Sequence, residues 1–250
     1  MKQQLRTTLH GLTLVYVIVF AVAALADEAA AQRLLDQHQA LEPRLRQNQF
    51  MRPVVLDSME LADKVAGEIF VVVDYPFATV SSALTDPEDW CDVMSLHINT
   101  KYCRAAVTPG GTLLTVHLGK KTPQKLQDAA QLQFNYTTLS QTPGYFAISL
   151  DADKGLLGTS NYRIGLEAVP LPNEQSFLHL TFSYSMGLMA RVAIKTYLAT
   201  IGRGKVGFTA VGERVDGESP RFIGGVRAVA GPPALREPRA FQAEQPVDEA

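Results

Sequence analysis

The chain has 250 residues, of which 46% are hydrophobic and 19% are charged, and its formal net charge is −2. A chain of this length and composition can bury a complete hydrophobic core, and one folded domain is the natural expectation. The weak negative charge gives the protein no electrostatic attraction for nucleic acid, so we exclude nucleic-acid binding.

The N-terminus has the pattern of a secretory signal peptide over residues 1–26. Lys2 and Arg6 precede an apolar run over residues 12–25, and residues 24–26 supply the small side chains of a cleavage site. The run is shorter than the about 20 residues that a membrane span needs, although an uncleaved membrane anchor is the alternative. We therefore expect an exported protein, periplasmic or secreted. Cleavage would remove two bases and no acid, which would shift the net charge to −4.

Two cysteines, Cys91 and Cys103, predict a disulfide bond. A small, even number of cysteines is compatible with a bridge in an exported chain. Closing a loop of this length would stabilise the fold by about 2–3 kcal/mol. Two buried thiols are the alternative. No second pair of ligands at finger-like spacing follows, so we predict no metal site and no cofactor.

Residues 27–66 precede the expected domain. Their first part is rich in Ala, Gln, Leu and Arg and predicts a helical lead-in that Pro43 interrupts. Residues 51–65 predict a connector with a strand-like piece around residues 54–56.

The domain itself is expected over residues 67–227. It opens with a β-branched run at residues 69–73, which predicts a strand. A short helix follows over residues 77–84. Asp86 is a natural N-cap for a second helix, because a proline and two acids follow it. We expect Trp90, in the first turn of that helix, to pack into the core.

Six more strands are expected before a closing helix, and their sign is alternation with a period of two. It is clearest in residues 114–118, 131–136, 146–150, 162–166 and 177–184. Such alternation indicates an antiparallel sheet with one solvated face. His179 lies on the outward side of its strand, where we expect solvent. The glycine-containing stretch 155–161 lacks the lysine of a phosphate loop and predicts a connection between strands.

The closing helix is expected from Leu188 to Ile201. Arg191 and Lys195 lie four residues apart on its polar side. Solvent is their default partner, and an acidic headgroup or protein partner is the alternative. Residues 206–226 predict a hairpin, and residues 228–250, with their prolines and scattered charges, predict a disordered tail.

The order of these elements resembles the START-like (SRPBCC) helix-grip superfamily over residues 67–201. Members have a first strand, two short helices, six antiparallel strands and a long C-terminal helix held by the sheet. They often place an aspartate-proline-tryptophan-like segment after the first strand, where this chain has residues 86–90. The resemblance implies an α+β fold with a strongly curved antiparallel sheet of about seven strands, two short helices and a C-terminal helix. It also implies an internal apolar pocket.

Three tyrosines are candidates for binding a ligand in such a pocket. Tyr136, Tyr162 and Tyr184 fall on the apolar side of their strands. A phenol on a core face needs a hydrogen-bond partner and is often placed at the edge of a cavity. We add His97, which lies between the cysteines and close to Lys101. Ordinary sheet tyrosines and a structural histidine are the alternatives.

The expected function is non-catalytic binding of a hydrophobic small molecule or lipid in an internal cavity. We predict no catalytic residue. An enzyme of cyclase or hydrolase type is the first alternative, since the superfamily contains both; it would rely on His97 and Tyr162. The second alternative is an envelope interaction protein whose interior its own side chains fill. The partners expected are an apolar small molecule or lipid and, peripherally, a membrane surface. Fold analogy alone does not separate these functions.

Overall fold

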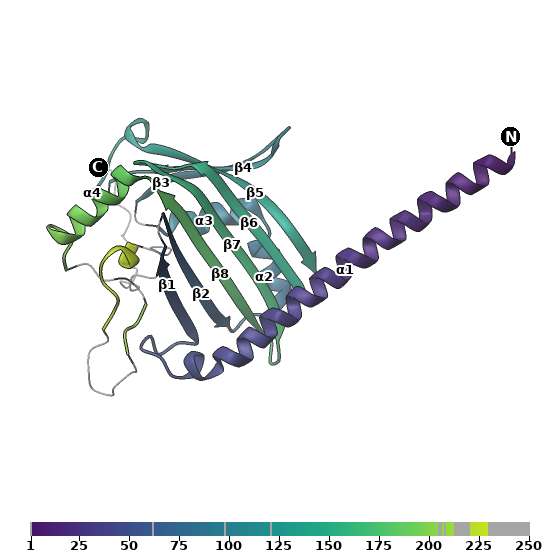
Figure 1. Cartoon of the computed structure of the whole chain (residues 1–250), viewed down its shortest axis with the longest axis horizontal. Helices are drawn as coiled ribbons and strands as arrows, with labels where there is room; N and C mark the ends of the chain where they lie inside the picture. The colour runs from purple at the N-terminus through teal and green to yellow at the C-terminus, as the bar shows by residue number, and fades with distance from the viewer. Residues whose placement is uncertain are drawn as a thin grey trace, which may run out of the picture.

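The centre of the structure, a computed structural model, is one antiparallel sheet of eight strands in the order β1-β2-β8-β7-β6-β5-β4-β3 (Figure 1). The structure describes residues 2–61, 63–97, 99–120, 122–204, 207, 209–212 and 221–229. The strands are β1 (Val54–Glu60), β2 (Lys64–Val73), β3 (Thr100–Thr108), β4 (Gly111–Leu118), β5 (Ala130–Thr142), β6 (Tyr145–Lys154), β7 (Thr159–Leu171) and β8 (Gln175–Met186). The α-helices are α1 (Lys2–Arg46), α2 (Phe77–Leu84), α3 (Pro87–Ser95) and α4 (Leu188–Ala199), and the 3-10 helices are η1 (Leu126–Asp128) and η2 (Val226–Val229).

The predicted α+β fold class is confirmed. The sheet is strongly curved, two short helices follow β2, and a helix follows β8 (Figure 1). The sheet has eight strands, which corrects the prediction of about seven. Residues 54–60 form a full strand, longer than the piece predicted at residues 54–56, because β1 pairs along its whole length with β2.

Helix α3 begins as its sequence predicts. The Asp86 side chain accepts a hydrogen bond from the Glu88 backbone N–H at 2.8 Å, and a proline occupies the first helical position. Trp90 is 2% exposed, and its Nε1 donates to the Leu84 carbonyl at 2.7 Å. The indole therefore joins the end of α2 to α3 inside the core, as predicted.

Helices α2 and α3 cover one face of the curved sheet, which we call the inner face (Figure 1). Phe77 of α2 and Trp90 of α3 belong to the largest buried cluster of the protein. The strand residues of that cluster include Leu114, Phe134, Phe146, Ile148, Leu150, Leu166 and Leu178. Their alternation along each strand places them on the same side, so the inner face carries the main core.

The opposite, outer face lies against α1. The sequence predicts a solvated face here, and that prediction is wrong where α1 crosses the sheet. Ala30, Leu34 and Leu45 of α1 are buried in one cluster with Phe70 and Phe177. The helix supplies an apolar side that excludes water from the strands beneath it. It also continues past the predicted interruption, since Pro43 lies inside its last turn.

The chain after β8 packs at one end of the sheet and then along β1. Ala190 and Leu198 of α4 are buried in a cluster that includes Tyr184 and Val226. Beyond α4, a bridge between residues 210 and 222 supports the predicted hairpin. Its turn at residues 213–220 and the tail from residue 230 lie outside the described residues. Within the described part of the chain, no helix is both long and apolar enough to span a membrane.

Candidate ligand site

Four aromatic side chains gather on the inner face where β7 begins and β8 ends. We call them the aromatic cluster; they are Phe134, Tyr162, Phe182 and Tyr184. The rings of Tyr162 and Tyr184 stack with their centroids 5.2 Å apart and their planes at 15°. Phe182 lies 6.1 Å from Tyr162, and Phe134 meets Tyr162 edge-on at 6.3 Å. Offset and edge-on arrangements are the ones that aromatic rings favour.

Tyr162 and Tyr184 lie opposite each other on β7 and β8, next to a bulge in β7. Ser160 pairs with Ser185 and Arg163 with Ser183, so two residues of β7 lie opposite Tyr184 alone. One of the two, Asn161, has a left-handed φ of 52°. Tyr162 has the same parity as Ile164 and Leu166 and therefore faces the inner side, and the extra residue shifts the alternation of β7 only before it.

The two phenol hydroxyls differ in their partners. Tyr162 and Thr159 join their hydroxyl oxygens at 2.8 Å, and the Thr159 hydroxyl in turn donates to the Leu156 carbonyl. Since a threonine hydroxyl has one hydrogen to donate, Tyr162 is the donor to Thr159. No hydrogen bond joins the Tyr184 hydroxyl to a described residue; the residue as a whole is 7% exposed, and its hydroxyl is not among the fully buried polar atoms that lack a partner.

Burial sets the charge state of both phenols. Removal from water raises the pKa of Tyr162, with the Thr159 hydrogen bond as a smaller opposing effect. Burial and, to a smaller degree, the neighbouring Tyr162 raise the pKa of Tyr184 to about 12. Both groups therefore stay protonated near neutral pH and act as hydrogen-bond donors.

Several apolar side chains of the inner face are only partly covered. Leu180 and Phe182 of β8 and Val93 and Met94 of α3 pack against the main core, which includes Phe134 of the aromatic cluster, without being fully buried. Apolar area on the inner face thus stays accessible beside Tyr184. Such area is stabilised when a ligand or another side chain removes it from water.

The other two predicted site residues lie elsewhere. Tyr136 is buried, and its hydroxyl donates to the Thr85 carbonyl at 2.8 Å, which ties β5 to the junction of α2 and α3. His97 follows α3; burial lowers its pKa, and its Nδ1 accepts the Asn99 backbone N–H at 3.3 Å. Lys101 donates to the Thr122 carbonyl at 3.2 Å. Of the four predicted site residues, the structure places Tyr162 and Tyr184 in contact, whereas Tyr136 and His97 lie apart from them. Ligand binding by all four stays a prediction.

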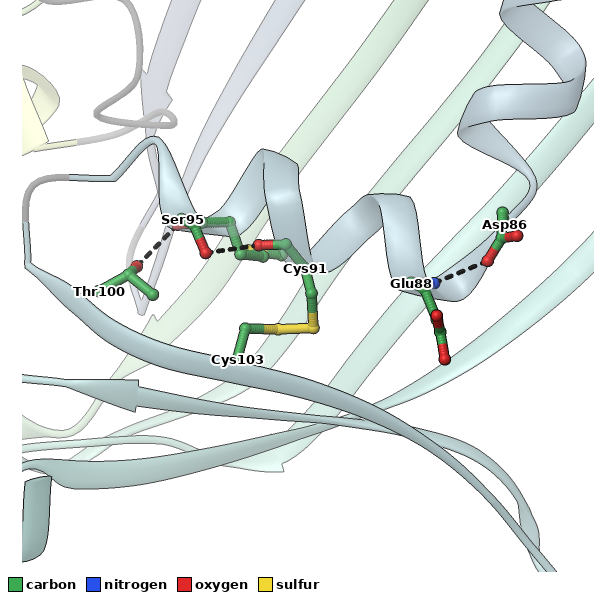
Figure 2. The surroundings of a disulfide bond; sticks show 7 residues. Asp86, Glu88, Cys91, Ser95, Thr100 and Cys103 are labelled. Atoms are coloured by element: carbon green, nitrogen blue, oxygen red, sulfur yellow. Dashed lines mark hydrogen bonds between the residues drawn. A yellow bond between two sulfur atoms is a disulfide. The ribbon is translucent and has the colours of Figure 1, made fainter. Parts of the chain in front are cut away.

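The predicted disulfide joins Cys91 of α3 to Cys103 of β3, with the Cα atoms 5.2 Å apart (Figure 2). Two hydrogen bonds secure the same region. Ser95 donates to the Cys91 carbonyl at 2.7 Å, and Thr100 donates to the Met94 carbonyl at 2.7 Å. Helix α3 is therefore held covalently against β3, the strand at one edge of the sheet.

A polar network on the outer face was not predicted from the sequence. The Tyr145 hydroxyl donates to Glu167 at 2.7 Å, and His179 Nδ1 lies 3.0 Å from the other oxygen of that carboxylate. His179 Nε2 lies 3.6 Å from the Glu68 carboxylate. The imidazole stacks on Phe70 with the ring centroids 4.1 Å apart. His179 is 8% exposed, which corrects the expectation of a solvated residue. The cause is that Phe70 stacks on the imidazole and the two carboxylates flank it.

Comparisons with known proteins add likenesses of fold only. The sequence matches no protein-family model, and no curated protein is significantly similar to it. Similar solved structures include a START superfamily protein from Mycobacterium smegmatis, at 15% identity over 51% of this chain and 79% of that chain, with a TM-score of 0.35. The ZhuI aromatase/cyclase from Streptomyces sp. R1128 has 14% identity over 56% of this chain and 86% of its own, with a TM-score of 0.38. Norcoclaurine synthase from Thalictrum flavum has 14% identity over 58% of this chain and 90% of its own, with a TM-score of 0.38. The fold assignment rests on the strand order and pairing of this chain itself.

Proposed function

We propose that this chain binds a largely apolar small molecule or lipid on the inner face of its sheet, and that Tyr184 donates a hydrogen bond to the polar end of the ligand. The observation that carries the proposal is the Tyr184 hydroxyl, which belongs to a ring stacked among other aromatic rings and makes no hydrogen bond to a described residue, although it is not among the fully buried polar atoms that lack a partner. A ligand that covers this hydroxyl would remove it from water, and leaving a buried hydroxyl unpaired costs about 1–3 kcal/mol. A ligand whose polar end accepts the hydrogen bond avoids that cost.

The electrostatics of the cluster favour binding over acid–base catalysis. A general base works best when its pKa lies near the working pH. Tyr184, with a pKa of about 12, holds its proton at neutral pH and offers a fixed donor instead. The neighbouring apolar side chains supply contact area for the rest of the ligand.

The proposal includes export of the protein before it binds its ligand. The signal-like residues 1–26 and the bridge between Cys91 and Cys103 support it, since disulfides persist in oxidising compartments. N-terminal sequencing of the protein from its native host tests this part. Recovery of the chain from the reducing cytoplasm with two free thiols would contradict it.

Titration of the purified chain with cis-parinaric acid, a fluorescent fatty acid, tests ligand binding. Tyr184→Phe is expected to weaken binding about fivefold, because a hydrogen bond contributes about 1 kcal/mol net. The same substitution is expected to leave the unfolding midpoint unchanged, since the hydroxyl makes no hydrogen bond to a described residue. A purely structural tyrosine would show the reverse.

Tyr136→Phe is the matched control, because its hydroxyl already has a protein partner at 2.8 Å. We expect this variant to lose some stability and to keep its affinity for the probe. Absence of probe binding by the wild-type chain, or equal affinity of wild type and Tyr184→Phe, would refute the proposal.

A further inference from the structure

Four large apolar side chains lie exposed together beside the start of α4. Leu188, Met189 and Val192 are 76%, 79% and 52% exposed, and Leu157 in the turn between β6 and β7 is 95% exposed. The two segments touch, since the Gly187 backbone N–H donates to the carbonyl of residue 158 at 3.1 Å. We call these four residues the apolar end patch.

The apolar end patch is separate from the side of α4 that packs on the protein. Ala190 and Leu198 face inward and are buried. Leu188 and Val192 lie four residues apart and therefore share another side of the helix. Helix α4 thus has one apolar side that meets the core and a second without a partner among the described residues. Contiguous exposed apolar surface of this kind marks an interaction site.

The backbone conformation of Leu157 also supports an interaction site at the apolar end patch. Its φ is 54°, in the left-handed region that glycine and asparagine occupy most easily. A leucine there carries a backbone cost and, being 95% exposed, buries no apolar area within the described structure to offset it. Contact with something outside the fold would supply that burial.

The charge beside the apolar end patch is positive. Residues 188–204 contain Arg191, Lys195 and Arg203 and no acid, although the whole chain has a net charge of −2. Lys195 and Arg203 are exposed. A second copy of the chain docking on the same patch would bring these like charges together. An anionic surface complements them.

We propose that the apolar end patch docks on a membrane surface that contains anionic lipids. The aliphatic side chains enter the boundary between headgroups and acyl chains, and the basic side chains meet the headgroup phosphates. Peripheral binding depends on this combination of buried apolar area and electrostatic attraction. The inference is independent of the ligand proposed for Tyr184.

Co-sedimentation of the full chain with phosphatidylcholine vesicles, with and without phosphatidylglycerol, tests the proposal. We expect stronger binding to the anionic vesicles. Leu188→Ser combined with Met189→Ser is expected to lower that binding about tenfold or more. Lys195→Gln is expected to lower it about fivefold, with the effect fading at high salt. Residues 12–25 are apolar and are present in every variant, so any vesicle binding through them is common to all of them. A difference in vesicle binding between variants therefore reports the contribution of α4.

Val107→Ser is the matched control. Val107 is 88% exposed near the turn that joins β3 to β4, and its replacement is expected to leave vesicle binding unchanged. Unfolding midpoints equal to wild type verify that each variant is folded. Vesicle binding that the Leu188 and Met189 substitutions do not reduce would overturn the proposal. So would a dimer of the wild-type chain that these substitutions convert to a monomer without any change in vesicle binding.

Discussion

Replacing Glu167 by glutamine is expected to destabilise the fold at neutral pH. Its carboxylate accepts hydrogen bonds from the Tyr145 hydroxyl at 2.7 Å and from His179 Nδ1 at 3.0 Å. A glutamine amide has one acceptor oxygen, so it keeps at most one of these bonds. Its NH₂ group faces a second donor unless His179 moves its proton from Nδ1 to Nε2, and that change replaces a hydrogen bond to a charged group by a neutral one.

The magnitude follows from the bond that is lost. A hydrogen bond to a charged group contributes about 1.5–3 kcal/mol. The Glu167 side chain is 27% exposed, so solvent screens part of this, and we expect a loss of about 2 kcal/mol. For a protein of this size 1 kcal/mol lowers the unfolding midpoint by about 2–4 °C, so the expected fall is about 4–8 °C.

The loss is expected to depend on pH with a defined sign. Burial alone would raise the pKa of Glu167, but hydrogen bonds from His179 and Tyr145 and the charges of His179 and Arg33 bring the pKa below its usual value. A carboxyl group with a lowered folded-state pKa stabilises the fold above its unfolded-state pKa, and this stability disappears as pH falls through the folded-state pKa. The difference between wild type and Glu167→Gln should be complete above about pH 5 and shrink below about pH 4.

Guanidinium unfolding followed by circular dichroism at about pH 7, 5 and 3.5 measures this difference. Asp153→Asn is the control, because this side chain is 81% exposed and its ion pair with Arg163 is a surface pair. Such pairs contribute about 0–1 kcal/mol. An unchanged stability of Glu167→Gln at neutral pH, or an equal deficit at all three pH values, would refute the reasoning.

The disulfide and one glycine give two further predictions. Cys91→Ser combined with Cys103→Ser should lower the free energy of unfolding by about 2–3 kcal/mol, and reductant should bring the wild-type midpoint down toward that of the variant. Thermal unfolding measures both, and a reductant-insensitive wild type would contradict the prediction. Gly155→Ala should cost about 1–3 kcal/mol, because the new Cβ would lie 2.2 Å from the Tyr162 ring. Gly144→Ala, with nothing within 4 Å of its Cβ, should be close to neutral, and equal midpoints for the two alanine variants would count against this account.

Local patterns predicted the strands and helices well, because their causes are local. Alternation along residues 177–184 follows from the extended backbone, and it separated the two faces of β8 correctly. The cap at Asp86 and the proline after it fix the start of α3 within one turn. Neither signal depends on the rest of the chain.

The burial of the outer face was missed because it depends on a distant segment. The outward residues of β8 include Phe177, which is fully buried, and His179, which needs two carboxylates from other strands. The placement of α1 covers Phe177, and side chains of neighbouring strands surround His179. Local hints were Phe177 and the continuous apolar run at residues 69–73, since large apolar side chains are unusual on a solvated face.

The candidate site was predictable in part for the same reason. Strand parity placed the tyrosines on the inner face, but it carries no information about hydroxyl partners. Tyr136 reaches Thr85, which is 51 residues away along the chain. The stacking of Tyr162 on Tyr184 depends on the register between β7 and β8, which the alternation within each strand does not specify.

The position of β2 in the sheet governs when the protein can fold. Ile69 of β2 pairs with Leu180 of β8, the last strand to leave the ribosome (Figure 1). Contacts so distant along the chain form slowly, because the intervening loop must first close. The edge of β2 that pairs with β8 therefore has no partner until β8 has been synthesised. During that interval the chain is still unfolded, which is the state that some translocation machineries require. The apolar residues of β2 are then also accessible to a holding chaperone.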